Sequence, residues 1–204
     1  SNLKNITLVA CGSSYYSGLV AREWFERFTR IKVDVEIASE FRYREAPMDS
    51  SGLTIFISQS GETADTLAAL KHCKKLNQKT VSIVNVPNSS MSRNSDASLK
   101  IFAGPEIGVA STKAFTCQLL VLACLAISIG RENGIISNSD ENEYVESILN
   151  LPRLISNVLN KEDDIIDLVN HFYPFSNALY LGRGQMFPIA MEGALKLKEI
   201  SYIH

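Results

Sequence analysis

Hydroxyl side chains and a glycine are concentrated in one short stretch, Ser58-Gln59-Ser60-Gly61-Glu62-Thr63. An apolar run at 53–57 precedes it and a helical pattern at 64–76 follows it, so we expect a strand, a turn and the start of a helix. A helix N-terminus carries partial positive charge and free backbone N–H groups, and Gly61 lets the backbone approach a ligand closely. With three hydroxyls beside them, these groups suit a phosphate dianion. The stretch therefore predicts a site for a small phosphorylated metabolite.

Two features of this stretch limit that interpretation. The lysine of the G-x-x-x-x-G-K-[ST] nucleotide loop is missing, which argues against ATP as the ligand. A plainer role is also available, because serine is a preferred N-cap residue and Ser60 could simply cap the following helix. Taken alone, the turn favours this capping role over phosphate binding.

A similar plan of strand, glycine turn and helix occurs near both ends of the chain. An apolar run at 6–10 leads into Cys11-Gly12-Ser13-Ser14 and a helical pattern, and a run at 178–181 leads into Gly182-Arg183-Gly184 and a helical run at 188–202. The recurrence predicts a duplicated α/β unit, with the first copy and only the opening of the second present. Because a lone strand leaves both of its edges unpaired, we expect the chain to be a fragment of a longer protein.

Short apolar runs alternate with helical patterns through the first part of the chain. Strands are expected at 6–10, 33–37, 53–58, 81–84 and 99–102. Ser39 is expected to cap a brief helix at 40–44. Strands that alternate with helices through short connections predict a parallel sheet with helices on both faces, which is an α/β fold of three layers.

A long apolar segment and two amphipathic ones follow this alternation. Residues 112–129 are apolar on nearly every side, which predicts a helix buried all round. Its length would also suit a membrane span, but Lys113 and Gln118 interrupt the apolar part, and burial against a second lobe or a dimer partner fits better. Residues 131–142 are predicted to be a linker, and amphipathic helices at 143–159 and 163–172 are expected to bridge to the next unit.

Length, charge and the first residues exclude several classes of protein. A chain of 204 residues is long enough for one domain plus something extra. Its formal net charge is −2, and its Lys and Arg residues are scattered, so nucleic acid is not an expected partner. The start lacks a basic segment followed by a long apolar one. We therefore expect a cytoplasmic protein that does not bind membranes.

The cysteines and histidines give little support for a metal site. The four cysteines form no C-x-x-C pair and are expected to be reduced and buried: Cys11, Cys73, Cys117 and Cys124. The three histidines share no ligand spacing with them: His72, His171 and His204. We expect neither a metal nor another cofactor.

Four motifs, taken in order, resemble the isomerase region of the glutamine:fructose-6-phosphate aminotransferase family, the glucosamine-6-phosphate synthases. They are Cys11-Gly12-Ser13-Ser14, the stretch from Ser58 to Thr63, Glu106-Ile107-Gly108-Val109-Ala110-Ser111-Thr112-Lys113 and Glu192-Gly193-Ala194-Leu195-Lys196-Leu197-Lys198-Glu199. The resemblance runs from about Ile6 to His204 and implies the sugar isomerase (SIS) fold, with two flavodoxin-like units in the complete enzyme. It implies a first SIS unit at 1–130, a linker and bridging helices at 131–176, and the start of a second SIS unit at 177–204.

The resemblance also implies roles for individual residues. The phosphate of the sugar would be held by Ser14, Ser58, Gln59, Ser60 and Thr63. The sugar hydroxyls would be bound by Ser13, Ser111 and the backbone of Val109. Many relatives have threonine where this chain has Ser13, and that difference keeps the hydroxyl. Glu199 resembles the base that moves a proton between C1 and C2 of the sugar, with Lys196 beside it near the reacting atoms.

The spacing of charges on the last expected helix admits two interpretations. Lys196 and Glu199 are three residues apart, so both can point into one pocket. Glu192 and Lys196 are four apart, which is the spacing of an ordinary surface ion pair. Spacing alone favours the surface pair. The resemblance favours a catalytic role for Lys196 and Glu199, and leaves the role of Glu192 undecided.

The activity implied by the resemblance is conversion of fructose 6-phosphate and glutamine-derived ammonia into glucosamine 6-phosphate, so either sugar phosphate is an expected ligand. The family's glutaminase domain, its downstream histidine and its C-terminal Schiff-base lysine have no counterpart in this sequence. The chain alone is therefore expected to be inactive, with the glutaminase domain of a parent chain as partner. A regulatory sugar-phosphate sensor and a simple sugar-phosphate isomerase are the alternatives. A homodimer is expected, because the apolar helix at 112–129 and the incomplete second unit leave hydrophobic surface that a partner would bury.

Overall fold

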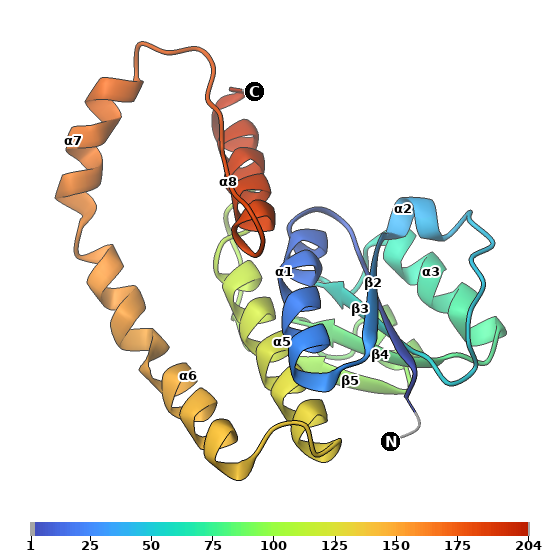
Figure 1. Cartoon of the computed structure of the whole chain (residues 1–204). Coiled ribbons are helices and arrows are strands. Elements are labelled where there is room, and N and C mark those ends of the chain that lie inside the picture. The colour runs from blue at the N-terminus through green and yellow to red at the C-terminus, as the bar shows by residue number, and fades with distance from the viewer. Residues whose placement is uncertain (1–2, 204) are drawn as a thin grey trace.

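The computed structural model describes residues 3–203, which form a five-stranded parallel sheet, helices on both of its faces and a long helical arm (Figure 1). The strands are β1 (Asn5–Ala10), β2 (Lys32–Ile37), β3 (Leu53–Ser58), β4 (Lys79–Val84) and β5 (Ala97–Lys100). Their order across the sheet is β2-β1-β3-β4-β5, and every neighbouring pair is parallel. This order is that of flavodoxin-like folds, so the predicted fold class is confirmed.

Two hydrophobic clusters hold the three layers together. Helices α1 (Gly12–Thr29) and α5 (Lys113–Glu132) cover one face of the sheet, where Phe25 and Leu122 pack against Leu8. Helices α2 (Ala38–Phe41), α3 (Ala64–Lys75) and α4 (Ser90–Asn94) cover the other, where Leu70 packs against Phe56. Because strand side chains alternate between faces, neighbours such as Leu8 and Val9 belong to opposite clusters. Continuous apolar strands are therefore what this doubly covered sheet requires.

Helix α5 is a core helix with one exposed strip. Ala114, Gln118, Leu122 and Ala126 are buried against α1 and the sheet. An exposed strip at the same four-residue spacing runs along the opposite side: Thr116, Leu120, Cys124 and Ser128. In this single chain the strip is exposed, and its predicted burial against a second lobe or a dimer partner stays a prediction. Within residues 3–203, α5 is the helix long and apolar enough to cross a membrane by length and composition, a test that core helices also pass.

A helical arm leaves the end of α5 and returns to pack beside α1 (Figure 1). It comprises α6 (Asn138–Leu159), α7 (Glu162–Phe172) and α8 (Met186–Ser201). Helix α6 begins at a capping box in which the side chains and backbone of Ser137 and Asp140 bond reciprocally, so the linker is shorter than the predicted 131–142. No residue of α6 or α7 is buried, whereas α8 packs along α1. How these elements divide into folding units stays a prediction, and residues 1, 2 and 204 of the proposed ranges lie outside the described chain.

Several local predictions are corrected. Residues 178–181 form no strand within the described chain, and Leu179 and Leu181 are about 90% exposed, because no neighbouring strand offers hydrogen bonds. Strand β5 begins two residues earlier than the predicted 99–102. Ile37, not Ser39, occupies the N-cap of α2. The four cysteines are free, but Cys73 alone among them is fully buried and Cys124 is exposed.

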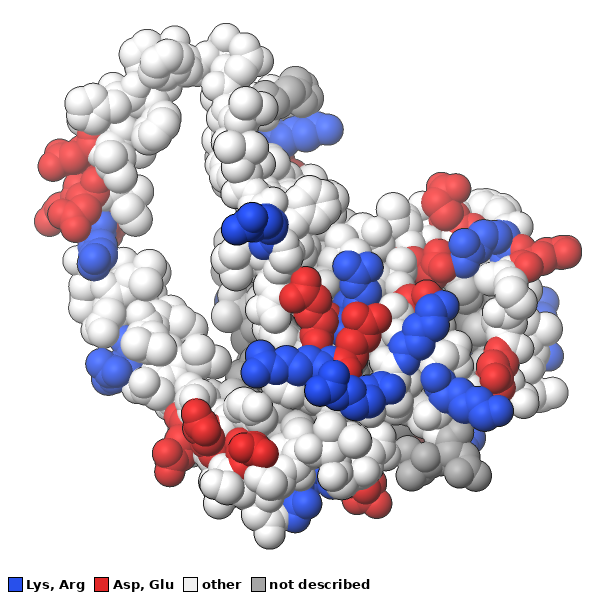
Figure 2. All heavy atoms as spheres, viewed as in Figure 1, with Lys and Arg blue, Asp and Glu red and all other residues white. Residues whose placement is uncertain are grey.

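Charges of both signs are interspersed on the face shown in Figure 2, over the sheet-bearing unit. Some of them form ion pairs that tie elements together. Arg42 after α2 contacts Asp65 in the first turn of α3 at 2.6 Å, and Arg131 at the end of α5 contacts Glu141 in α6 at 2.9 Å. All four side chains are about a third exposed, so each pair contributes little stability and mainly orients its elements.

Candidate functional site

The predicted hydroxyl turns meet at the carboxyl end of the sheet, between β1 and β3. The strand order reverses at β1, which makes this the position where open α/β sheets bind ligands. A cavity of about 330 Å³ lies there. Its lining includes all eight residues predicted to bind substrate: Ser13, Ser14, Ser58, Gln59, Ser60, Thr63, Val109 and Ser111. The structure thus brings together three segments that are far apart in the sequence.

The turn between β3 and α3 is held in shape by its own hydroxyls. Ser58 Oγ lies 3.0 Å from Thr63 Oγ1 and accepts a hydrogen bond from the Gly61 N–H at 3.0 Å. Gly61 has φ +67°, a conformation that favours glycine. Ser60 Oγ accepts from the Glu62 N–H at 3.1 Å, within the turn. Because α3 starts at Ala64 and Thr63 is its N-cap residue, the capping role considered for Ser60 is wrong.

The acidic residue of this turn is directed away from the cavity. The Glu62 carboxylate accepts a hydrogen bond from the Ser90 N–H at 2.7 Å, at the start of α4. Hydrogen bonds from Ser90 hold the pKa of the Glu62 carboxyl below its usual range. The negative charge of Glu62 is thus directed toward the start of α4. The positive ends of α1 and α3 both lie at the cavity, and neither helix has a side-chain cap. This combination favours an anion.

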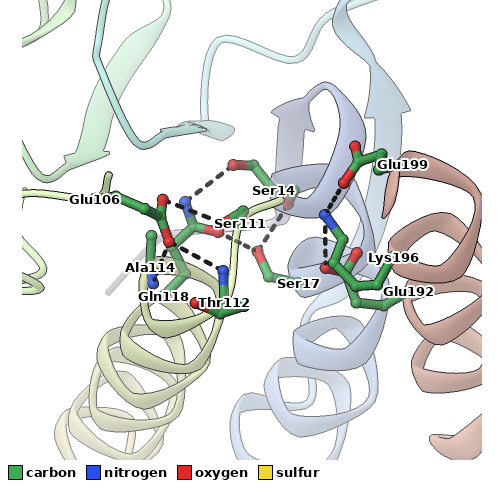
Figure 3. Close-up of polar contacts among 10 residues, drawn as sticks. All are labelled: Ser14, Ser17, Glu106, Ser111, Thr112, Ala114, Gln118, Glu192, Lys196 and Glu199. Atoms are coloured by element: carbon green, nitrogen blue, oxygen red, sulfur yellow. Dashed lines mark hydrogen bonds and ion pairs between the residues drawn. The ribbon is translucent and has the colours of Figure 1, made fainter. Parts of the chain in front are cut away.

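A third segment, the loop before α5, is fixed by a carboxylate. The Glu106 side chain accepts hydrogen bonds from the Thr112 N–H at 3.0 Å, the Ala114 N–H at 3.4 Å and the Ser111 hydroxyl at 3.4 Å (Figure 3). It thereby supplies the partners that the N-terminus of α5 needs. The Val109 side chain is 96% exposed, so its part of the loop can meet a ligand by its backbone.

Sequence reasoning gave no role to Glu106 or to Gln118. Gln118 lies on the buried side of α5, and its amide Nε2 donates to Ser14 Oγ at 2.9 Å (Figure 3). A signal for both was available. Glu106 precedes a helix that has no capping side chain of its own, and Gln118 is an amide within an apolar helix, where it requires a buried partner.

The charged residues of α8 form a second group, beside α1. Lys196 contacts Glu199 directly and lies 3.7 Å from Glu192 Oε1 (Figure 3). Glu192 is only 6% exposed, and neither of its carboxylate oxygens makes a hydrogen bond within the described residues. Burial raises the pKa of the Glu192 carboxyl, and the nearby Ser13 hydroxyl and Lys196 ammonium only partly offset this. The interpretation of Glu192 and Lys196 as a surface ion pair is therefore wrong.

The two groups adjoin at the start of α1. Ser13 lines the cavity and also interacts with Glu192, but Lys196 and Glu199 are not among the described residues that line the cavity. The catalytic roles of Lys196 and Glu199 stay predictions. Across residues 3–203, no three His, Cys, Asp or Glu side chains converge so that they could hold a metal ion.

A 2-1-3-4-5 parallel sheet with hydroxyl turns and uncapped helix N-termini at its switch point defines an α/β domain suited to phosphorylated ligands. The SIS domain family matches residues 1–128, and the chain belongs to this family. It is 56% identical over its whole length to a protein of Bradyrhizobium diazoefficiens named glutamine–fructose-6-phosphate aminotransferase [isomerizing], and 55% identical to one of the same name from Zymomonas mobilis. The predicted family resemblance is confirmed.

A solved structure agrees with these relatives. The C-terminal domain of glucosamine-fructose-6-phosphate aminotransferase from Francisella tularensis superposes with a TM-score of 0.97 at 45% identity, covering all of this chain and 58% of that one. The chain spans about a third of the length of the curated relatives, 33% and 34% in the two cases. Two thirds of each relative therefore lie outside the match.

Proposed function

We propose that the protein binds fructose 6-phosphate or glucosamine 6-phosphate in the cavity between β1, β3 and the loop before α5. The observation that carries this proposal is the meeting of all eight predicted substrate residues around one cavity. The hydroxyls of Ser14, Ser58, Ser60 and Thr63 and the amide of Gln59 bind the phosphate, beside the N-termini of α1 and α3. Ser13, Ser111 and the backbone of Val109 bind the hydroxyls of the sugar.

The proposed reaction is isomerisation of the sugar phosphate by movement of a proton between C1 and C2. A carboxylate near these carbons is required to take the proton and return it to the neighbouring carbon. Glu199 is assigned this role, and Lys196 fixes its carboxylate by their ion pair. Glu192 holds Lys196 from the other side, so one ammonium group is shared by two carboxylates. The arrangement keeps the base in one orientation.

The wider proposal is that the protein acts as the isomerase part of a glutamine:fructose-6-phosphate aminotransferase. Support comes from the names of the relatives and from the length of those relatives outside the match. A glutaminase domain would then supply ammonia, and the product would be glucosamine 6-phosphate. A phosphorylated sugar as substrate also fits the cytoplasmic location expected from the sequence. A homodimer is part of the proposal, because α6 and α7 expose apolar side chains along their whole length.

A second candidate function is a regulatory sugar-phosphate sensor. It is favoured by one observation, that within the described chain α8 contributes no residue to the lining of the cavity. A sensor would bind the same sugar phosphate and would not require Glu199. The two functions therefore differ in chemistry rather than in binding.

Calorimetry with fructose 6-phosphate and with fructose tests the binding step. We expect the phosphorylated sugar to bind far more tightly, because each hydrogen bond to a charged group contributes roughly 1.5–3 kcal/mol. The double change Ser60→Ala and Thr63→Ala should weaken binding of fructose 6-phosphate by about 10²-fold or more while the protein stays folded. Equal affinities of the parent protein and the double variant for fructose 6-phosphate would show that the phosphate does not bind at this turn. The matched change Ser92→Ala, in α4 away from the cavity, controls for the loss of a hydroxyl.

A further inference from the structure

Gln118 is a buried amide on the apolar side of the core helix α5. Its side chain is 1% exposed, between Ala114 and Leu122 on the same buried face. An amide removed from water destabilises the fold unless it is hydrogen-bonded, so its partners explain its position. Nε2 donates to Ser14 Oγ at 2.9 Å, and Oε1 lies 3.3 Å from the Ser17 hydroxyl. Both partners belong to the first two turns of α1 (Figure 3).

These contacts set the direction of the Ser14 hydroxyl. A hydroxyl has one hydrogen to donate and two lone pairs that accept. Because the amide of Gln118 donates to Ser14 Oγ, the hydrogen of Ser14 remains available for a ligand. A phosphate dianion has only acceptor oxygens, so a hydroxyl held in this way has the polarity that a phosphate needs. The one hydrogen of Ser17 Oγ faces two acceptors, the Ser14 carbonyl at 2.7 Å and Gln118 Oε1 at 3.3 Å, and the shorter contact fixes the backbone of Ser14.

We propose that Gln118 is a positioning residue that holds the Ser14 hydroxyl as a hydrogen-bond donor to the phosphate of the bound sugar. Gln118 acts through Ser14, because Ser14 lines the cavity and Gln118 does not. The inference rests on the proposed function, and it names the component of the site that recognises phosphate. It also gives a reason for an amide on the buried side of an apolar helix, which sequence periodicity alone leaves unexplained.

The first test replaces the amide and measures affinity. Gln118→Met keeps the size of the side chain and removes its N–H group, and Ser17 can still donate to the Ser14 carbonyl. We expect fructose 6-phosphate to bind about tenfold more weakly by calorimetry, the effect of one hydrogen bond. Gln118→Asn, whose amide is one methylene too short to reach Ser14, should weaken binding similarly. Leu122→Met, one turn further along the same buried face, is the matched control and should leave the affinity unchanged.

The second test asks whether Gln118 acts through Ser14. In a Ser14→Ala protein, the further change Gln118→Met should have no additional effect on affinity, because the hydroxyl that it orients is already missing. Additive losses in the double variant would show a general structural role and overturn the inference. So would unchanged affinity of both Gln118 variants in a protein whose parent binds fructose 6-phosphate. Failure of the parent protein itself to bind the sugar phosphate would instead refute the proposed function.

Discussion

Burial raises the pKa of the Glu192 carboxyl above its ordinary value. It lies at the junction of α8 and α1, beside Ser13 and Tyr16, and it shares Lys196 with Glu199. Burial raises the pKa of the Tyr16 hydroxyl as well, and the Glu192 carboxylate raises it further. The contact between α8 and α1 therefore contains a buried ionisable group.

Removal of this charge should stabilise the protein at neutral pH. Because the folded pKa of Glu192 is raised, the folded state binds its proton more tightly than the unfolded state does. The protonated Glu192 carboxyl therefore contributes its full stabilisation of the folded state below the ordinary glutamate pKa of 4.5. This stabilisation is lost as pH rises through the pKa of Glu192 in the folded state. We expect Glu192→Gln to have the higher free energy of unfolding near pH 7, with the difference closing below about pH 4.5. Urea unfolding across this range measures it.

The matched change Glu146→Gln, on the exposed surface of α6, controls for the loss of one negative charge. A Glu192→Gln protein less stable than its parent at neutral pH would mean that the pairing with Lys196 outweighs the burial of the carboxylate. That result would contradict the interpretation of Glu192 given above.

Residue types predicted the hydroxyl side chains that line the cavity, but they did not predict Glu106 and Gln118, which fix the segments around it. The hydroxyls around Ser58 could be predicted because their chemistry is local to one turn. Gln118 contacts Ser14, a residue far away in the sequence, and Glu106 lies outside the helix whose N-terminus it contacts. The hydrophobic periodicity of a helix does not predict contacts of either kind. Glu192 is buried because α8 packs against α1. The spacing of Glu192 and Lys196 within α8 could not show this packing, and it predicted a surface ion pair.

At the scale of elements, the turn between β3 and α3 depends on Gly61. A Cβ at this position would lie 2.1 Å from Ser89 Oγ and 2.6 Å from Ser89 Cβ, and the Gly61 carbonyl accepts from the Met91 N–H at 3.0 Å. The turn is therefore packed directly against the start of α4, where Ser89 is the N-cap residue. Any side chain at position 61 must therefore displace either the turn or the start of α4.

Gly61→Ala should destabilise the protein by about 2–4 kcal/mol, which combines the strain of a positive φ with the overlap at Ser89. It should also abolish measurable binding of fructose 6-phosphate, because the hydroxyls of the turn move with it. Gly104→Ala is the matched control. Its φ is +68° and a Cβ there meets nothing within 4 Å, so it should cost only the backbone strain of about 1–2 kcal/mol. Thermal unfolding and calorimetry measure both effects, and equal losses of stability in the two variants would argue against the packing at Ser89.

The elements that bury their apolar faces are the ones that sequence predicted well. Strands β1 to β4 and helices α1 and α3 have patterns that match their burial in the two clusters. Residues 178–181 have a strand-like pattern and form no strand within the described chain, since pairing needs a partner that the pattern cannot supply. The linker was predicted too long, because the cap formed by Ser137 and Asp140 starts α6 before its first apolar residue.

At the scale of the whole molecule, the arm leaves a large apolar surface uncovered. Leu149, Leu159 and Phe172 are each about 70% exposed, and Figures 1 and 2 show α6 and α7 standing away from the rest of the chain. Exposed patches of this kind in soluble proteins mark interaction surfaces. A second copy of the chain is the simplest occupant, because a two-fold contact would cover the same surface on both.

We expect sedimentation to show a dimer at micromolar concentration, and Leu149→Glu to shift it toward monomer because the contact would have to bury a charge. Ser147→Glu adds the same charge on another side of α6 and should leave the dimer intact. A monomer that persists at high concentration in the parent protein would contradict the proposed homodimer.

We propose that Glu199 on α8 moves a proton of a sugar phosphate bound in the cavity, and exchange of the C1 proton tests this proposal most directly. Fructose 6-phosphate is incubated with the proposed full-length parent protein that contains this chain, in deuterated water without an ammonia donor, and loss of the C1 proton signal is followed by NMR. We expect the parent to catalyse exchange and Glu199→Gln to bind the sugar phosphate equally well but exchange about 10²–10⁴-fold more slowly, the usual contribution of a positioned base. Exchange by Glu199→Gln at the parental rate would contradict the claim and favour the sensor.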